Sequence, residues 1–243
     1  MSEHIRLSES DGWLEIALCR PAKKNALTAA MYHAMTGALL GATARDDIAC
    51  VLITGDGDAF CAGNDLADFV QGPDGAAPAM AFIEALAAFD KPLVVAVQGM
   101  AVGIGTTMLL HCDLVYAAPD ARFAMPFVKL GLVPEAGSTL LLPACIGHQR
   151  AFAWMALGEV IGSEEARQLG LINQITPREG LDEAVAAMAR KLLKLSPSSL
   201  NHTKAMMRDP EKLWQIIRAE GAVFRRQLVS PEAQAAFMAF LSK

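Results

Sequence analysis

The 243-residue sequence predicts an α/β fold, in which a mixed core of strands and helices is followed by a helical C-terminal third. Short apolar segments typical of buried strands, residues 50–55, 91–99 and 113–119, alternate with glycine-rich loops and helical stretches. Hydrophobic residues make up 53% of the chain, which is enough to bury a sizeable core. After about residue 163 the strands become rare and helical patterns dominate.

The N-terminal elements follow from local pattern. Residues 5–20, "IRLSESDGWLEIALCR", alternate apolar and polar side chains on both sides of a Ser-Asp-Gly turn, which predicts a β-hairpin. Thr28 is the expected N-cap of a helix through residues 29–40, and a short apolar strand, "CVLITG", follows at residues 50–55.

The middle of the chain contains a charge-free segment, residues 92–112, that is long enough for a membrane span. Polar residues and glycines interrupt it, Gly103 and Gly105 among them, so we expect an apolar strand, a glycine turn and a helix that begins near Ile104. The next strand is expected at residues 113–119. This profile is typical of a buried α/β core.

The remaining segments define the predicted domain limits. The Gly/Pro-rich segment 70–78 is expected to form a mobile rim or lid. Helices are expected within residues 163–175, 181–195 and 197–208, around one short strand, with Ser163 capping the first helix and Gly170 ending it. We therefore divide the chain into a core, residues 1–190, and a helical C-terminal region, residues 191–243, that is expected to contribute to oligomerisation.

Composition excludes several classes of function. The formal net charge of −5 argues against a general nucleic-acid or membrane-surface binder. The five cysteines are scattered and include no CxxC pair, and the five histidines are far apart, so neither a disulfide framework nor a metal site is expected. The N-terminus lacks the apolar segment of a signal peptide, and we expect a cytoplasmic protein.

Two glycine-rich loops, residues 60–66 and 98–108, bring backbone N–H groups to the ends of apolar strands. The second contains Gly103 and Gly105, but Met108 stands where a dinucleotide-binding fingerprint has its third glycine. Two such loops suit an oxyanion hole, in which amides from two segments stabilise a developing negative oxygen.

Glu135 is the single charged residue of "GLVPEAGSTLLLP", residues 131–143. Such a residue is either a solvated loop side chain or an acid or base whose pKa is displaced by its surroundings. The local sequence leaves both interpretations open; if Glu135 is an acid or base, the flanking Leu132, Val133 and Pro134 would remove water from the carboxylate and raise its pKa.

Several segments together resemble the crotonase family, also called the enoyl-CoA hydratase/isomerase superfamily. They occur in the family's order and cover essentially the whole chain: "RPAKKNAL", "AFCAGNDL", "KPLVVAVQGMAVGIGTTMLLHCDLVYAAPDARFAMPF", "GLVPEAGST" and "SEEARQLGLINQI". The resemblance implies a spiral of ββα units that binds an acyl-CoA thioester and stabilises its enolate, assembled as a homotrimer or a dimer of trimers. CoA enters as part of the substrate, and no further cofactor is implied.

The resemblance also assigns site residues. The oxyanion amides of the family correspond to those of Asn64 and Ile104. The cluster Arg20, Lys23 and Lys24 is a candidate anion patch beside the CoA phosphates. The expected backbone contacts to CoA are at Ala22, Lys24, Ala62, Gly63, Asn64, Asp65 and Leu66.

The acid–base residues separate the reactions of the family. Hydratases use two glutamates, whose positions are occupied here by Thr107 and Phe127, and neither side chain exchanges protons at neutral pH. The 3-enoyl-CoA to trans-2-enoyl-CoA isomerases instead place one glutamate where this chain has Glu135. The resemblance therefore implies an isomerase of fatty acid β-oxidation, because one carboxylate can remove a proton from C2 and return it to C4.

Two alternatives remain open on the sequence. Within the superfamily, Glu135 could direct a water molecule, as in a hydratase or thioester hydrolase. The chain could also be a non-catalytic member that binds acyl-CoA or another partner.

Overall fold

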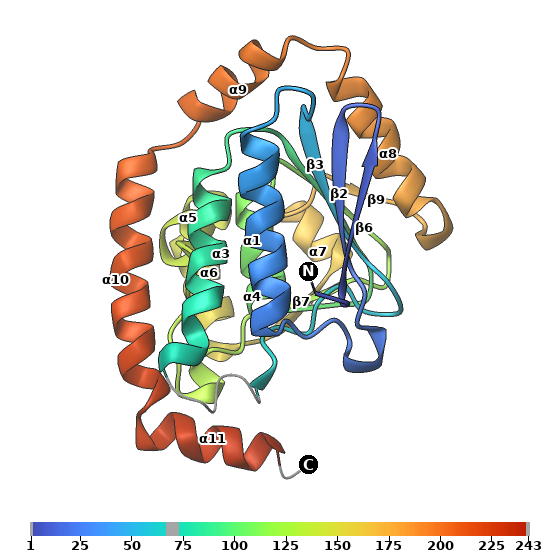
Figure 1. Cartoon of the computed structure of the whole chain (residues 1–243). Coiled ribbons are helices and arrows are strands. Elements are labelled where there is room, and N and C mark those ends of the chain that lie inside the picture. The colour runs from blue at the N-terminus through green and yellow to red at the C-terminus, as the bar shows by residue number, and fades with distance from the viewer. Residues whose placement is uncertain (1, 67–72, 242–243) are drawn as a thin grey trace.

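The computed structural model describes residues 2–66 and 73–241 and contains a six-stranded sheet with the order β1-β2-β3-β4-β6-β9 (Figure 1). In this sheet the hairpin β1–β2 is antiparallel and the other four strand pairings are parallel. The predicted hairpin and the three predicted buried strands are thus confirmed. The strands are β1 (Ile5–Ser10), β2 (Trp13–Leu18), β3 (Cys50–Gly55), β4 (Leu93–Val97), β6 (Leu114–Ala117) and β9 (Gln174–Ile175).

A second, three-stranded sheet has the order β5-β7-β8, formed by β5 (Met100–Val102), β7 (Arg122–Ala124) and β8 (Val160–Gly162). Successive turns of the chain place one strand in each sheet: β4 is followed by β5, and β6 is followed by β7. The turn that begins with β3 reaches the small sheet through a single bridge between Cys61 and Ala101. This repetition is the predicted spiral of ββα units.

Helices cover both faces of the large sheet. Helix α8 (Leu181–Leu192) packs on β3, β4 and β6, whereas α1 (Ala29–Thr43) and α3 (Ala77–Ala88) pack against each other on the opposite side (Figure 1). The main apolar core lies beneath α1 and α3. The Thr28 hydroxyl accepts a hydrogen bond from the Met31 N–H, which confirms the predicted N-cap.

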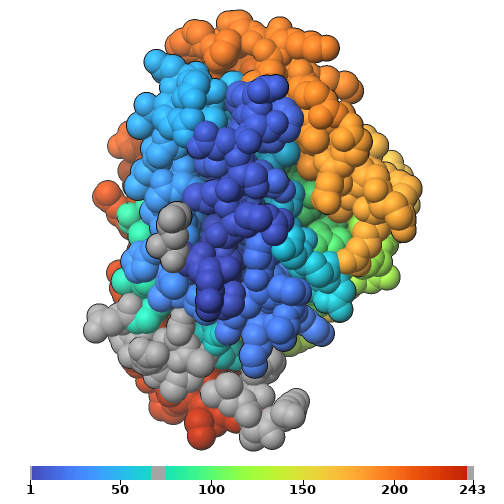
Figure 2. Space-filling model, turned by 45° about the vertical axis from the view of Figure 1, so that its right-hand side comes forward, coloured from blue at the N-terminus to red at the C-terminus, as the bar shows by residue number. Residues whose placement is uncertain are grey.

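The remaining helices surround the core. Seen from a different side, the N-terminal hairpin lies on the surface, with the orange helices of the C-terminal third at its edge (Figure 2). The helices other than α1, α3 and α8 are α4 (Ile104–Thr107), α5 (Ser138–Ile146), α6 (His148–Leu157), α7 (Ser163–Gln168), α9 (Pro197–Met206), α10 (Pro210–Leu228) and α11 (Pro231–Leu241). Short 3-10 helices are η1 (Pro21–Lys23), η2 (Pro73–Ala76), η3 (Met108–His111), η4 (Val128–Leu130) and η5 (Arg178–Gly180).

Two local predictions need correction. Of the segment 70–78, expected as a rim or lid, residues 70–72 lie outside the described residues, and residues 73–78 form η2 and the start of α3. Ser163 is the first residue of α7 rather than its cap, because its hydroxyl donates to the Pro119 carbonyl. Gly170, with φ +81°, follows the end of α7 as predicted.

The domain limit expected at residue 190 falls inside α8, two residues before that helix ends. The charge-free segment 92–112 is divided among β4, β5, α4 and η3. Among the described helices, none combines the length and the apolar content that a membrane span requires.

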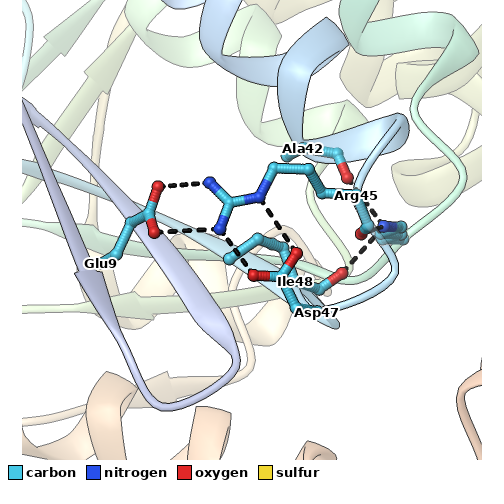
Figure 3. A network of polar contacts seen from close by, with 6 residues as sticks. Glu9, Ala42, Arg45, Asp47 and Ile48 are labelled. Carbon is cyan, nitrogen blue, oxygen red and sulfur yellow. Dashed lines mark hydrogen bonds and ion pairs between the residues drawn. The ribbon is translucent and has the colours of Figure 1, made fainter.

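Lys91 stabilises the chain where α1 ends. Its buried ammonium donates to the carbonyls of Ala42, Arg45 and Ile48 at 2.7, 2.5 and 2.8 Å, so all three of its protons have acceptors (Figure 3). Arg45 lies between the carboxylates of Glu9 and Asp47 on the same side of the molecule (Figure 3). These contacts attach the end of α1 to the start of β4 and to the hairpin.

Candidate active site

Three segments that follow the small-sheet strands form the site. Residues 61–66 follow the bridge at Cys61, α4 follows β5, and the loop 131–137 follows β7 and η4. Each segment therefore occupies an equivalent place in successive turns of the spiral. Because neighbouring turns pair with each other, residues far apart in the sequence are brought together.

Glycines allow the first two segments to approach closely. A Cβ at Gly105 would lie 2.6 Å from the Cys61 carbonyl oxygen and 2.9 Å from the Cys61 Cβ, so α4 can begin there only without a side chain. Gly63 has φ +96°, and a Cβ there would lie 3.1 Å from the Val102 carbonyl oxygen. Gly105 and Gly63 thus allow the two segments to pack closely against each other, whereas a Cβ at Gly103 would meet only the Phe127 ring, at 3.9 Å.

The amides of Asn64 and Ile104 are available to a ligand. The two residues that flank Asn64 are hydrogen-bonded to Leu27. The Leu27 N–H donates to the Gly63 carbonyl at 2.8 Å, and the Asp65 N–H donates to the Leu27 carbonyl at 2.9 Å. Ile104 is the first residue of α4. Within residues 2–66 and 73–241, neither of these two N–H groups donates a hydrogen bond to a protein acceptor. Both therefore satisfy one requirement of an oxyanion donor.

Tyr32 holds the Asn64 side chain. The phenol, on α1, is buried and donates a short hydrogen bond to Asn64 Oδ1. Burial raises the pKa of Tyr32, with smaller contributions from Cys61 and Glu135, so the hydroxyl stays protonated as a donor. Helix α1 thereby fixes the side chain of the residue whose backbone amide is exposed to the site.

Glu135 lies among buried groups in the loop before α5, and the residue is only 6% exposed. Thr107 Oγ1, at the end of α4, donates to Glu135 Oε1 at 2.5 Å. Burial raises the pKa of Glu135 to about 8, the Thr107 hydrogen bond lowers it, and the charge of Glu220 raises it. The structure thus agrees with the predicted displacement of this pKa by loss of water.

Two further buried side chains hold the backbone of this loop. Ala136 has φ +62°, a left-handed conformation that is uncommon for a residue with a Cβ. His111 Nε2 lies 2.7 Å from the Ala136 carbonyl oxygen, and burial lowers the pKa of His111 to about 4, so a neutral imidazole donates this bond. Glu220, on α10, accepts from the N–H groups of Gly137 at 2.6 Å and Thr139 at 2.9 Å.

The residues expected along CoA lie in two segments, residues 21–24 and 62–66, which are hydrogen-bonded to each other. The Ala62 N–H donates to the Lys24 carbonyl at 2.9 Å, which joins η1 to residues 62–66. Lys23 and Lys24 are exposed. The third residue of the expected anion patch, Arg20, forms an ion pair with Asp65 at 2.6 Å and also donates to the Ala26 carbonyl.

Other candidate residues have structural positions. Burial raises the pKa of the Cys61 thiol to about 12, which is unfavourable for a nucleophile. Phe127 is buried, with its ring 3.9 Å from the position of a Cβ on Gly103, so an aromatic wall lies where a hydratase carries its second carboxylate. Asp113 accepts hydrogen bonds from the Leu93 N–H and from Lys204, so its carboxylate anchors the backbone at the start of β4.

Sequence reasoning did not identify four contacts of this site. In the sequence, Thr107 marks only the absence of a carboxylate. Its position one helical turn after Gly103 is the only sequence signal for a contact with the site. No local pattern could indicate Tyr32, His111 or Glu220, because each acts across 25 or more residues of sequence.

Comparison with known proteins shows the family. The family model described as enoyl-CoA hydratase/isomerase matches residues 8–243. Enoyl-CoA delta isomerase 2 of Rattus norvegicus is 33% identical over 252 residues, which cover 100% of this chain but only 64% of the rat protein. The 2,3-dehydroadipyl-CoA hydratase of Escherichia coli (strain K12) is 32% identical over 249 residues, covering 100% of this chain and 97% of that protein. Relatives of similar identity thus have names that refer to different reactions.

A solved structure extends the similarity to the whole fold. OdaA of Pseudomonas aeruginosa superposes with a TM-score of 0.95 at 45% sequence identity, and the alignment covers 100% of both chains. The family match and these relatives agree with the spiral fold and with the sequence motifs. The chain therefore belongs to the enoyl-CoA hydratase/isomerase family, the crotonase superfamily.

Proposed function

We propose that the protein binds 3-enoyl-CoA thioesters and shifts their double bond to give trans-2-enoyl-CoA. The observation that carries this proposal is the acid–base inventory of the site. Glu135 is a buried carboxylate with a raised pKa, whereas both oxygens of the neighbouring buried Glu220 accept hydrogen bonds from the backbone of residues 137 and 139. The two positions used by hydratases hold a threonine and a phenylalanine. One base is sufficient for a double-bond shift, because the proton that leaves one carbon can return to another.

The chemistry balances without water. The ionised Glu135 takes a proton from C2, and the electron pair of the broken C–H bond forms a dienolate whose charge rests on the thioester oxygen. The Asn64 and Ile104 amides donate to this oxygen, a contribution of about 3–4 kcal/mol for each donor in comparable sites. Glu135 then delivers the proton to C4, a C–H bond forms there, and the double bond is left between C2 and C3.

The two hydrogen-bonded segments, residues 21–24 and 62–66, support thioester binding. In this proposal the backbone of Ala22, Lys24 and Ala62–Leu66 follows the CoA moiety, with Lys23 and Lys24 beside its phosphates. The acyl group then extends toward Glu135, and CoA is part of the substrate rather than a separate cofactor. The physiological role that we propose is the conversion of 3-enoyl intermediates in fatty acid β-oxidation.

Hydration is the second candidate, and the similarity to a 2,3-dehydroadipyl-CoA hydratase is the observation that favours it. Glu135 alone would then have to activate a water molecule and protonate the neighbouring carbon. No second acid–base side chain stands at Thr107 or Phe127 to share these steps. Isomerisation is therefore the better match to the residues present.

The two candidates differ in their substrates. Wild-type protein should convert 3-hexenoyl-CoA to the conjugated 2-enoyl thioester, which is followed by its ultraviolet absorbance, and should leave crotonyl-CoA largely unhydrated. Efficient hydration of crotonyl-CoA without isomerisation of 3-hexenoyl-CoA would reject the isomerase proposal in favour of the hydratase. Release of free CoA thiol from either compound would indicate a thioester hydrolase.

A further inference from the structure

Thr107 differs from its neighbour Thr106 in what its hydroxyl contacts. Both side chains are buried at the end of α4. The Thr106 hydroxyl lies 2.6 Å from the Ala101 carbonyl and 3.1 Å from the Ala124 carbonyl, so it joins strands β5 and β7 of the small sheet. The Thr107 hydroxyl donates instead to Glu135 Oε1 at 2.5 Å. One hydroxyl supports the backbone, and the other contacts the proposed base.

We propose that Thr107 is a positioning residue for proton transfer, which holds Glu135 Oε1 so that Oε2 exchanges the proton with the substrate. This inference rests on the proposed isomerase function. In the described part of the chain, Glu135 Oε2 accepts no hydrogen bond, whereas Oε1 is occupied by Thr107. The two oxygens of the carboxylate are therefore not equivalent.

The hydrogen bond suits both halves of the reaction. While Glu135 is ionised, the hydroxyl donates to a charged acceptor, which is a stronger bond than one between neutral groups. After Oε2 has taken the proton, Oε1 is the carbonyl oxygen of the acid and still accepts from Thr107. The carboxyl group thus keeps one orientation while Oε2 moves between C2 and C4. A freely rotating carboxyl would present either oxygen, protonated or not, at the second step.

The surrounding groups make Thr107 important for the protonation of Glu135. Glu220 faces the loop from α10 and its negative charge raises the pKa of Glu135. Tyr32 on α1 stays protonated and His111 on η3 is deprotonated, so both side chains are neutral and His111 supplies no positive charge. The Thr107 hydroxyl is therefore the contact that favours the ionised form of Glu135.

Three variants test this role. Thr107→Val has nearly the same shape but lacks the hydroxyl, Thr107→Ser retains the hydroxyl, and Thr106→Val removes the neighbouring buried hydroxyl as a matched control. The measurements are the pH dependence of kcat/KM for 3-hexenoyl-CoA and an infrared titration of the Glu135 carboxyl in the free protein. The second measurement requires no turnover.

For Thr107→Val we expect kcat to fall by about 10- to 100-fold with a smaller change in KM, because the base is misoriented after binding. The pH at which kcat/KM reaches half its maximum should rise, because the ionised carboxylate has lost its donor. Thr107→Ser should restore most of both quantities. Thr106→Val should lower stability without moving the pH midpoint.

Three results would overturn the role of Thr107. The first is a pH profile of kcat/KM that is unchanged in Thr107→Val, and the second is a Thr107→Ser variant that does not restore the wild-type profile. The third is an equal shift of the pH midpoint in Thr106→Val. The infrared titration separates this result from failure of the proposed function. If the wild type isomerises nothing but Thr107→Val still raises the titration midpoint of Glu135, only the isomerase proposal fails. An infrared midpoint that is equal in wild type and Thr107→Val would contradict the hydrogen-bond role itself.

Discussion

Burial decides the protonation of Glu135 and, through it, part of the free energy of folding. The folded protein binds a proton at Glu135 up to a pKa of about 8, whereas the unfolded chain releases it near the ordinary value of 4.5. Between these two values the unfolded state binds fewer protons than the folded state. The contribution of this residue to stability is therefore full below pH 4.5 and is lost as the pH rises toward 8.

Glu135→Gln should remove this pH dependence. At pH near 8.5 we expect the variant to be more stable than the wild type, by at most about 5 kcal/mol, because it no longer buries a charge. Near pH 4.5 the difference should be small. Urea unfolding at both pH values measures it, with Glu84→Gln on the exposed face of α3 as a control. Equal stability of wild type and Glu135→Gln at alkaline pH would show that the carboxylate is solvated.

At the scale of elements, the site depends on the close contact between the start of α4 and residues 61–64. Gly105 is the point of closest approach, with no room for a Cβ beside Cys61. The third segment, the Glu135 loop, is attached differently. Glu220 connects it to α10, and His111 connects it to η3. The helical C-terminal third therefore contributes directly to the shape of the site.

Gly105→Ala should increase the distance between the two proposed oxyanion amides, those of Asn64 and Ile104. The new methyl group would require a shift of α4 away from Cys61, and a misplacement of this size lowers kcat on the order of 100-fold. Gly41→Ala on the exposed side of α1 is the matched control, because nothing lies within 4 Å of its Cβ position. That control should keep full activity and gain up to about 1 kcal/mol of stability. Steady-state kinetics on 3-hexenoyl-CoA and urea unfolding compare the two, and full activity of Gly105→Ala would contradict the geometry.

The local sequence pattern was sufficient to predict those strands and helix ends that are determined by residues close together in the sequence. The strand at residues 50–55 and the Thr28 cap were predicted correctly, since alternation, apolar runs and N-cap chemistry are local. Ser163 shows the limit of this reasoning: its residue type suits a cap, but the Pro119 carbonyl, 44 residues away, takes its hydroxyl. In the segment 70–78, the helix-forming alanines at 76 and 77 outweighed the Gly/Pro content in the part that the structure describes.

The same distinction applies to the candidate site. Glu135 and the two glycine loops were identifiable because a lone carboxylate and paired glycines stand out along the sequence. The contacts of Tyr32, Thr107 and Glu220 arise from the spiral, which brings together residues from different turns and from the C-terminal helices. The ion pair of Arg20 has the same origin, since its partner Asp65 is 45 residues away.

At the scale of the whole molecule, the proposed assembly is a homotrimer or a dimer of trimers. Several large apolar side chains are exposed on the single chain, among them Phe152 at 65% and Leu157 at 55% on α6. Burial of such side chains between subunits would stabilise an oligomer. Light scattering at micromolar concentration should give a mass three or six times that of the chain, and a monodisperse monomer would contradict the proposed assembly.

The central claim is that one carboxylate, Glu135, performs both proton transfers. The most direct test is the turnover of 3-hexenoyl-CoA by Glu135→Gln beside the wild type, with binding of the same thioester measured by calorimetry. Glutamine keeps the size and a polar group but cannot accept the proton, so kcat should fall by about 100- to 10,000-fold while the affinity changes little. Isomerisation by Glu135→Gln at a rate close to that of the wild type would contradict the claim.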